Sequence, residues 1–514
     1  MSGIPVIDIF AGPGGLSEGF ASLTKANKRS FEVRLSIEKD VIAHQTLSLR
    51  ALFRSFPVGR VPSAYYEYIR REITRDQLER HPDVEPYISQ AYSEARCAEL
   101  GPDSEKEIDE WIQTSLTGVE DWVLIGGPPC QAYSLAGRSR MRGVNPKGFE
   151  YDERHFLYRE YLRILKKFSP TVFVMENVKG ILTSRHDGSY IFNKILQDLK
   201  NPGDGQYYEI RSFVVPGVIK KSEDYIIKSE DYGIPQARHR VILFGIRSDI
   251  LKFLPDKFNN SDKYILKKSK EISVGEMLSD LPPLRSKLSN RKNSRVDSFA
   301  NWHQVIKDGF KMLGEKKNNV SPGVLAHAKL ANIRAINHEH TGGEFINGNF
   351  SMKHPLKTWY QDPRIRGVIQ HETRSHMESD LHRYLFASSF AMEKQRSPTL
   401  NDFPRCLLPE HENVNRASAP FSDRFRVQLG NQPSTTIVSH ISKDGHYYIH
   451  PDPSQCRSLT VREAARLQTF PDNYFFEGNR TQQYHQVGNA VPPLLAYKIA
   501  KIVFKILKYK SAST

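Results

Sequence analysis

Cysteine is scarce in this chain, with four in 514 residues: Cys97, Cys130, Cys406 and Cys456. Their irregular spacing forms neither a disulfide framework nor a CxxC pair for a metal. Free thiols of this kind are typical of a reducing compartment. We therefore expect no structural zinc and no disulfide, and the use of each thiol has to be judged from its own surroundings.

Long apolar runs are lacking as well. No stretch approaches the roughly 18 consecutive apolar residues of a membrane-spanning helix, and the start Met1-Ser2-Gly3-Ile4-Pro5 has no basic segment before an apolar one. These absences argue against secretion and against a membrane partner. We expect a protein that stays inside the cell.

Acidic residues are outnumbered by basic ones. The sequence has 73 Lys and Arg against 58 Asp and Glu, for a formal net charge of +15 and a pI near 9.4. Such an excess favours a polyanionic partner, and nucleic acid is the commonest one inside a cell. With 39% hydrophobic residues, a chain of this length can bury a sizeable core divided between two or more lobes.

One cysteine has distinctive surroundings. The run Asp121-Trp122-Val123-Leu124-Ile125 predicts a short buried strand, and Gly126-Gly127-Pro128-Pro129 then forms a rigid turn before Cys130. An isolated free cysteine is usually a small buried hydrophobe. A stiff turn at the carboxyl end of a strand, however, is where open α/β sheets build their sites. The turn favours a functional thiol.

A glycine turn near the start predicts a ligand cradle. Val6–Phe10 is typical of a strand, and the turn that follows contains Gly12 and Gly14. Because position 17 is serine, the turn lacks the GxGxxG spacing of pyrophosphate binding, and an adenosyl ligand fits better. A second strand, Phe31–Ile37, ends at Glu38, whose carboxylate can accept hydrogen bonds from ribose hydroxyls.

Four motifs together resemble one family. GGPPCQAYS around Cys130 is similar to the nucleophile motif of the DNA cytosine-5 methyltransferases, and DIFAGPGG from Asp8 resembles their S-adenosylmethionine motif. Glu176-Asn177-Val178 and Gln236-Ala237-Arg238-His239-Arg240 follow in the family's order. The likeness covers most of residues 1–247 and 457–500. It implies an α/β fold, namely a Rossmann-like S-adenosylmethionine-dependent catalytic domain with a second, smaller DNA-recognition domain.

The resemblance also implies roles for individual residues. Cys130 would attack C6 of a flipped cytosine, Glu176 would act at N3, and Arg240 would hold the base oxygen with Arg238 nearer the DNA backbone. The acidic contact to the adenine amino group stays open between Asp109 and Asp121. The expected contacts to S-adenosyl-L-methionine are Asp8, Phe10, Gly12, Gly14, Glu38, Pro129, Leu157 and Asn489.

Composition and motif order suggest a domain plan. Residues 1–247 would form the catalytic domain, with a helical insertion at about 50–118, and residues 486–514 would complete it. Residues 248–454, basic and rich in aromatics, would read DNA, and residues 455–485 would be a hinge. In the hinge, Thr460 and Glu463 have the spacing of a capping box. His371, His376 and His382 lack a recognised ligand pattern, so we expect them to be structural or DNA-facing.

These features predict a DNA (cytosine-5)-methyltransferase acting on double-stranded DNA. The lack of chromatin-reading segments indicates a prokaryotic or phage enzyme that is cytoplasmic and DNA-associated. Such an enzyme can be the modification half of a restriction-modification system, which makes a cognate restriction endonuclease a candidate partner. Two alternatives remain: cytosine-5 methylation of tRNA, and a catalytically silent DNA-binding relative. Retention of Cys130, Glu176 and Arg240 together opposes the second alternative.

Overall fold

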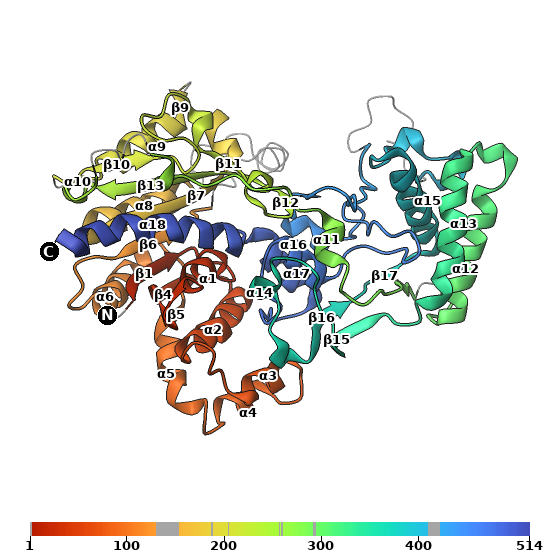
Figure 1. Cartoon of the computed structure of the whole chain (residues 1–514), viewed down its shortest axis with the longest axis horizontal. Helices are drawn as coiled ribbons and strands as arrows, with labels where there is room; N and C mark the ends of the chain where they lie inside the picture. Colours follow the sequence, from red (N-terminus) through yellow and green to blue (C-terminus); the bar gives the residue numbers. More distant parts are fainter. Residues whose placement is uncertain are drawn as a thin grey trace.

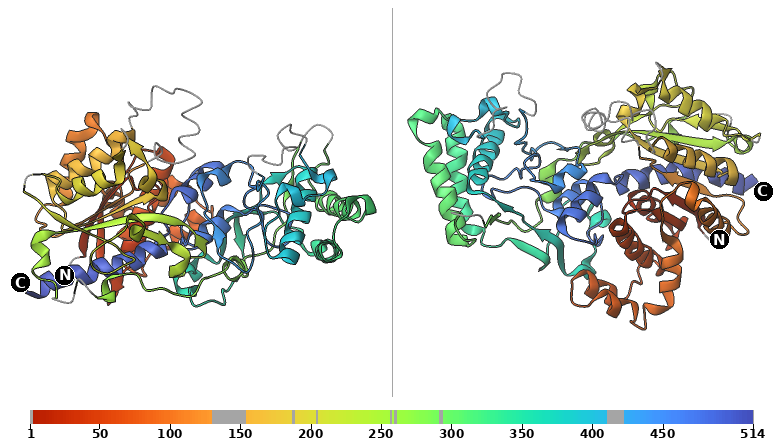
Figure 2. Two further views of the ribbon diagram at one scale, coloured as in Figure 1. Left: turned by 90° about the horizontal axis from the view of Figure 1, so that it is seen from above. Right: turned by 180° about the vertical axis from the view of Figure 1, so that it is seen from behind.

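The computed structural model describes residues 3–129, 154–186, 189–203, 205–255, 258, 261–290, 294–409 and 422–513. It has a sheet-containing part at one end and a helical part at the other, joined by a middle region (Figure 1). In the two further views the helices α12 and α13 again lie at the end far from the sheet (Figure 2).

The main sheet holds eight strands among the described residues, in the order β10-β13-β7-β6-β1-β4-β5, with β11 beside β13. The strands β5, β4, β1, β6 and β7 run parallel, whereas β13 is antiparallel to β7, β10 and β11. The α/β fold expected from the sequence is thereby confirmed. The strands are β1 (Ile4–Ile9), β4 (Phe31–Glu38), β5 (Ala95–Cys97), β6 (Val123–Gly126), β7 (Val172–Val178), β10 (Tyr208–Arg211), β11 (Ile226–Lys228) and β13 (His239–Arg247).

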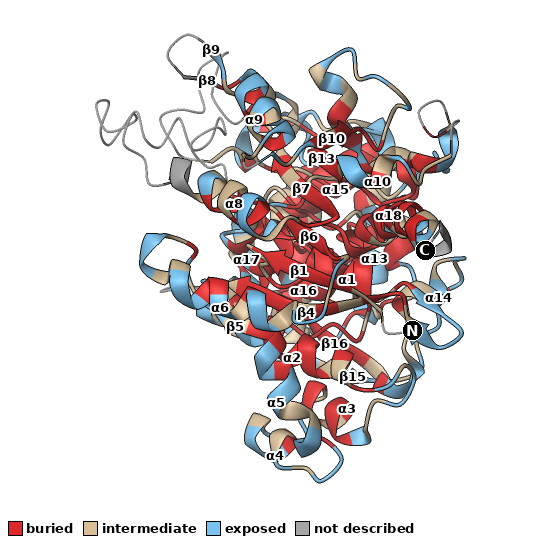
Figure 3. Ribbon diagram, turned by 90° about the vertical axis from the view of Figure 1, so that its left-hand side faces the viewer, coloured by how far each residue is buried: buried red, intermediate tan, exposed pale blue. Residues whose placement is uncertain are grey.

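Successive residues of a strand point to opposite faces of the sheet, and here the residues on both faces are apolar. Helices therefore cover both faces. On one face, Val6 and Val174 pack with α1 (Gly15–Ala21) and α18 (Pro493–Ser513). On the other, Ile7 and Met175 pack with α6 (Glu105–Ser115), α8 (Arg154–Phe168) and α9 (Ile191–Lys200). The central strands β1, β6 and β7 are accordingly almost wholly buried between two helical layers (Figure 3).

The expected helical insertion is helical apart from β5. After α2 (Val41–Ser55), the described α-helices of this segment are α3 (Ser63–Ile69), α4 (Arg75–Glu79), α5 (Glu85–Glu94) and, beyond β5, α6. β5 then adds to the sheet edge beside β4. A strand of three residues is too short to show a period of two, so this strand could not be predicted from the sequence pattern.

The far end is a helical cluster of α12 (Phe299–Leu313), α13 (Pro322–Arg334) and α15 (Glu378–Lys394), packed around Trp302 and Tyr384. The domain boundaries expected from the sequence stay predictions. The remaining helices are α10 (Ser248–Leu251), α11 (Val274–Leu278), α14 (Lys357–Tyr360), α16 (Val461–Leu467) and α17 (Arg480–Asn489). The remaining strands are β2 (Thr24–Lys25), β3 (Lys28–Arg29), β8 (Arg185–His186), β9 (Ser189–Tyr190), β12 (Gln236–Ala237), β14 (Lys287–Leu288), β15 (Gly342–Asn347), β16 (Gly367–Glu372), β17 (Ser375–His376) and β18 (Ser434–Thr435).

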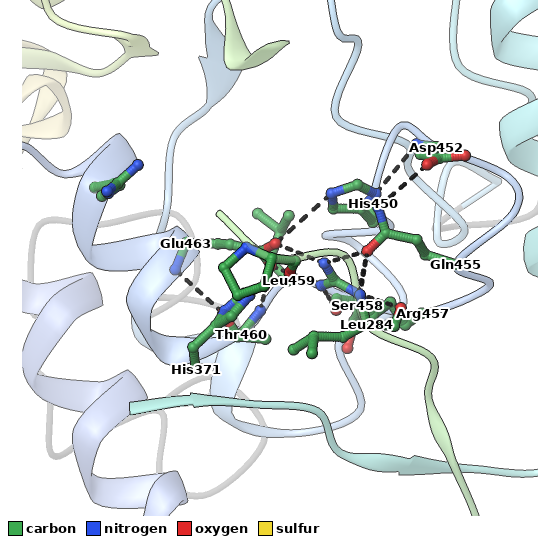
Figure 4. Close-up of polar contacts among 12 residues, drawn as sticks. Leu284, His371, His450, Asp452, Gln455, Arg457, Ser458, Leu459, Thr460 and Glu463 are labelled. Carbon is green, nitrogen blue, oxygen red and sulfur yellow. Dashed lines mark hydrogen bonds and ion pairs between the residues drawn. The ribbon is translucent and has the colours of Figure 1, made fainter. Parts of the chain in front are cut away.

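A buried ion pair at the start of α16 organises the middle region. Glu463 accepts from Arg457 Nη1 at 2.7 Å and Nη2 at 2.6 Å, and both side chains are 1% exposed. Glu463 also completes the expected capping box with Thr460, which is confirmed. Figure 4 shows His371 and His450 converging on the same group. The ion pair itself is local in the sequence, but Arg457 Nε also donates to the carbonyl of Leu284 and His450 Nε2 lies 3.6 Å from Glu463 Oε1, so the network as a whole connects separate segments of the middle region.

Candidate active site

A cavity of about 570 Å³ opens at one edge of the main sheet. The parallel strands β1, β4, β6 and β7 end there, and the antiparallel β13 begins there. This is the edge at which open α/β sheets bind ligands. Nine of the residues singled out from the sequence line the cavity: Phe10, Gly12, Glu38, Pro129, Leu157, Glu176, Arg238, Arg240 and Asn489.

The glycine turn and Glu38 form one half of the cavity. Gly12 N–H donates to Glu38 Oε2 at 2.8 Å, and Asp40 N–H donates to Glu38 Oε1 at 2.8 Å. A carboxylate has about four acceptor sites, so Glu38 can still accept from a ligand hydroxyl. Gly12 has φ 57°, and no atom lies within 4 Å of where its β-carbon would be. A ligand can therefore approach the backbone here.

The later glycines of this motif serve packing. A β-carbon on Gly15 would lie 2.3 Å from the carbonyl oxygen of Val491, and one on Gly19 would lie 2.4 Å from the β-carbon of Ala496. Both contacts are far below ordinary van der Waals distance. Helix α18 can therefore lie against α1 only because these two positions lack a side chain.

Asp8 and Gly14 were expected among the cofactor contacts, but neither lines the cavity. Gly14 caps α1 in the left-handed conformation, with φ 92°. Asp8 is fully buried, and neither carboxylate oxygen has a hydrogen-bond partner among the described residues. Burial raises the pKa of Asp8 to about 7, and the nearby Ser17 lowers this pKa by a smaller amount. The Ser17 hydroxyl itself donates a hydrogen bond to the carbonyl of Gly14.

The pKa of Asp8 predicts a pH-dependent stability. An aspartate with a raised folded-state pKa stabilises the fold at low pH, and this stability is lost as pH rises from about 4 to about 7. Asp8→Asn should therefore gain about 2–3 kcal/mol of unfolding free energy relative to wild type between pH 5 and pH 8. Urea unfolding of both proteins at the two pH values measures this. A difference that does not change with pH would contradict a buried, proton-retaining Asp8.

Glu176 and Arg240 form an ion pair on neighbouring strands. Antiparallel pairing sets Arg240 opposite Val178 and Ile242 opposite Glu176. Arg240 Nε lies 2.9 Å from Glu176 Oε1, and both side chains are 14% exposed. Glu176 Oε2 lies 3.0 Å from where a β-carbon on Gly127 would be, so the glycine makes room for the carboxylate. The two charged groups are held together at the cavity wall.

The turn that precedes the predicted nucleophile is held by Asn177. Its Nδ2 donates to the carbonyl of Pro128 at 3.4 Å, and its Oδ1 accepts from Val178 N–H at 2.8 Å. Pro128 and Pro129 both line the cavity. Cys130 itself lies outside the described residues, as do residues 131–153 that follow it.

Arg238 is placed differently from the expectation that it faces the DNA backbone. It is 2% exposed, and its Nη1 donates to the carbonyls of Ile437 at 2.9 Å and Gly488 at 3.3 Å. Burial, followed by the nearby Arg240, lowers the pKa of Arg238. The side chain therefore braces the segment at Ile437 and the end of α17, which also brings Asn489 to the cavity.

The two acidic candidates for the adenine amino group lie away from the cavity. Asp109 pairs with Arg163 and Lys167, and Asp121 pairs with Lys510. Glu99, which sequence reasoning missed, does line the cavity just after β5. Glu99 Oε1 accepts a hydrogen bond from Lys39 Nζ at 2.8 Å. The strand β5 is the feature that points to Glu99, because the end of β5 lies beside the end of β4 at the cavity.

The histidines of the middle region have internal partners. His371 contacts Thr460 and the carbonyl of Pro282, and His382 contacts the carbonyl of Val305. His376 is 3% exposed and lies 3.2 Å from the hydroxyl of Ser458. Within the described ranges, no group of three or more His, Cys, Asp or Glu side chains could hold a metal ion. Nor does any helix in those ranges have the length and apolar character needed to cross a membrane.

Comparison with known proteins decides the family. The profile of the C-5 cytosine-specific DNA methylases matches residues 82–505. The chain belongs to this family. The type II methyltransferase M.Bpa9945I of Bacillus paralicheniformis is 33% identical to the methylase, covering 98% of this chain and 99% of the relative. The DNA (cytosine-5-)-methyltransferase M.ApeKI of Aeropyrum pernix is 24% identical and covers 99% of both chains.

A solved structure agrees on the fold of the methylase. An E. coli prophage-encoded protein, described as a DNA modification methyltransferase, is 20% identical and superposes with a TM-score of 0.50. The superposition covers 98% of this chain and 99% of that one. The family and the enzyme class expected from the motifs are confirmed by these comparisons, and an S-adenosylmethionine-dependent methyltransferase follows from the family and fold.

Proposed function

We propose that the methylase flips a cytosine out of duplex DNA and transfers a methyl group from S-adenosyl-L-methionine to its C5 atom. The observation that carries this proposal is the Glu176–Arg240 pair, 2.9 Å apart, in the same cavity as the turn at Gly12. A carboxyl and a guanidinium can together hold the polar edge of a cytosine. The cavity thus offers a base-binding half and a nucleoside-binding half.

The cofactor half has the chemistry that an adenosyl group requires. Gly12 leaves the backbone open, Glu38 keeps acceptor capacity for ribose hydroxyls, and Phe10 offers an aromatic face. Glu99 is our choice for the adenine amino group, in place of Asp109 and Asp121. Pro129, Leu157 and Asn489 complete the lining. When bound, S-adenosyl-L-methionine supplies an electrophilic methyl group.

In the base half, Cys130 provides the nucleophile. Carbon 5 of cytosine is a weak nucleophile, and addition of the thiolate to C6 makes it enamine-like. The carboxylic acid form of Glu176, protonated from solvent, donates its proton to N3 as the sulfur–carbon bond forms, which offsets the charge that the ring gains and leaves the carboxylate that pairs with Arg240. After methylation, C5 loses its proton to solvent water, N3 returns its proton to Glu176, and expulsion of the thiolate restores the aromatic ring. Arg240 holds Glu176 and the base oxygen, and Arg238 positions the cavity wall.

The proposal also includes DNA recognition, the partner and the location of the enzyme. The basic and aromatic segment 248–454, which includes the cluster of α12, α13 and α15, would contact DNA and select the sequence. The relatives named type II methyltransferases support a role in restriction-modification, with a cognate restriction endonuclease as partner. A DNA-associated enzyme of this kind would act in the cytoplasm.

The direct test is transfer of a labelled methyl group from S-adenosylmethionine to duplex DNA, with tRNA in a parallel reaction. Methylation-resolving sequencing of DNA from a host that expresses the protein then locates the product. Labelled 5-methylcytosine in DNA is expected. Label in tRNA alone would support the RNA alternative, and binding without transfer would support a silent DNA-binding protein.

Glu38→Ala should weaken S-adenosylmethionine binding by about tenfold or more, because it removes the ribose acceptor and the hydrogen bond that orders Gly12. Calorimetric titration with S-adenosylmethionine measures the affinity. Glu32→Ala is the matched control, since Glu32 lies on the same strand and is absent from the cavity lining. Equal affinity in wild type and Glu38→Ala would refute the placement of the ribose.

A further inference from the structure

A second cavity, of about 590 Å³, lies away from the active site. One wall comes from α1, α2 and the β2–β3 hairpin, and contributes Arg29, Arg50 and Arg54. The opposite wall comes from the segment around α14 and from α18, and includes Trp359 and Tyr497. None of these residues lines the active-site cavity. Arg364 also lines the cavity but is paired with Asp362. The guanidinium groups of Arg29, Arg50 and Arg54 are the other three that border this space.

Two of the three arginines have acidic partners. Arg50 donates to Glu18 through Nε at 2.8 Å and Nη2 at 2.6 Å. Arg54 donates to Glu94 through Nε at 3.1 Å and through Nη2. All four side chains are less than a tenth exposed. Glu18 and Glu94 therefore balance two of the three positive charges.

Arg29 is the third cation and has no carboxylate partner within hydrogen-bond distance among the described residues. Its Nη1 donates a hydrogen bond to the carbonyl of Phe56 at 3.2 Å. Burial and the nearby Arg54 lower the pKa of Arg29. Arg29 is half-buried, and a cation that is partly removed from water is costly unless an anion compensates it.

Arg54 also keeps an unused donor. Its Nη1 is buried without a hydrogen-bond partner and lies 3.8 Å from Glu18 Oε2. Two other carboxylates lie near these arginines, Asp362 and Asp8. Asp362 accepts from Arg364, Tyr66 and Asn473. Burial raises the pKa of Asp8 to about 7, and the positive charge of Arg54 lowers it by a smaller amount. The Asp8 carboxylate has no hydrogen bond to Arg54.

We propose that this cavity is a binding site for a phosphate-type oxyanion, held by Arg29 and Arg54. The tetrahedral group presents oxygens in several directions and so matches guanidinium donors arriving from different elements. Lys501 lies over the ring of Tyr497, 4.3 Å from its centroid, which adds positive charge beside that wall. The phosphate can be free in solution or part of a DNA backbone. Because the cavity joins α2 to the segment around α14, an occupant bridges two parts of the molecule.

The test compares wild type with Arg29→Gln and uses Arg60→Gln as the matched control. Arg60 is an exposed arginine of the neighbouring loop and does not line the cavity. Isothermal titration with inorganic phosphate, at an ionic strength matched with chloride, should show binding to wild type and to Arg60→Gln. In Arg29→Gln the Kd should rise about tenfold or more. At saturating DNA, where a weaker contact to the DNA backbone does not limit the rate, methyl transfer by Arg29→Gln should stay within about twofold of wild type, which shows that the variant is folded.

A second arm separates the two sources of phosphate. If the occupant belongs to the DNA backbone, inorganic phosphate will not bind, and Arg29→Gln will lower the slope of log affinity for duplex DNA against log salt by about 0.9. The proposal is overturned if phosphate binds wild type and Arg29→Gln equally. It is also overturned if neither phosphate binding nor the salt slope depends on Arg29.

The unliganded protein gives an independent reading. In chloride buffer, Arg29→Gln should melt at or above the temperature of wild type, because the change removes a cation that the cluster does not balance. Added phosphate should then raise the melting temperature of wild type above that of the variant if free phosphate is the occupant. A lower melting temperature for Arg29→Gln in chloride would show that the cluster is already balanced, and would overturn the proposal.

Discussion

Cys130→Ser should lower methyl transfer by at least about 10³-fold, because a serine hydroxyl is far less nucleophilic than a thiolate near neutral pH. S-adenosylmethionine affinity should stay unchanged, since the cavity half built from Gly12 and Glu38 does not depend on the thiol. Transfer of labelled methyl groups to duplex DNA measures the first quantity, and calorimetry measures the second.

A trapping experiment tests the covalent step itself. DNA that contains 5-fluorocytosine should form a stable adduct with wild type, because fluorine at C5 blocks the proton loss that releases the enzyme. Cys406→Ser is the control: Cys406 is an exposed free thiol that does not line the cavity, and this variant should form the adduct normally. An adduct of undiminished yield in Cys130→Ser would mean that another residue attacks the base.

Glu463→Gln should lower the free energy of unfolding by about 3–5 kcal/mol, because it leaves the buried Arg457 without its charge partner. The capping box at the start of α16 weakens at the same time. Unfolding in guanidinium, followed by tryptophan fluorescence, measures the loss. Glu315→Gln is the matched control, because Glu315 is an exposed partner of Lys317 and should change stability by less than about 0.5 kcal/mol.

The same network predicts acid lability. Burial lowers the pKa values of His371 and His450 to about 4. Arg457 lowers the pKa of Glu463 despite the opposing effect of burial. Below about pH 6.5 these histidines take up protons in the unfolded chain but stay neutral in the folded chain. The free energy of unfolding therefore falls as the pH drops towards 4. Protonation of Glu463 removes more stability below that. Wild-type unfolding free energy that is constant from pH 7 to pH 4.5 would contradict neutral buried histidines.

The parts of the site that lie at strand tips could be predicted from the sequence. Glu38 and Glu176 each follow an apolar run, and parallel strands end at one edge of a sheet, so their shared cavity follows from local pattern. The Thr460–Glu463 capping box is equally local. In each case the residues that signal the structure are neighbours in the chain.

The rest depends on partners that are distant in sequence. Arg238 looks like a surface cation in QARHR, yet it is buried because Ile437 and Gly488 supply carbonyls from other segments. Gly15 and Gly19 look like ligand-binding glycines until α18 is in place. Glu99 escaped notice because its strand is three residues long. Neither local pattern nor residue spacing carries this information.

The packing of α18 on Gly15 and Gly19 has a consequence for the folding of the enzyme during its synthesis on the ribosome. Helix α1, which follows the cofactor turn, is synthesised near the start of translation, whereas the helix that covers it emerges near residue 493. Until then the apolar face of α1 lacks its cover and stays exposed. Nascent chains should therefore hold no cofactor, and the time needed to translate the intervening residues separates the start of synthesis from the first methylation of DNA.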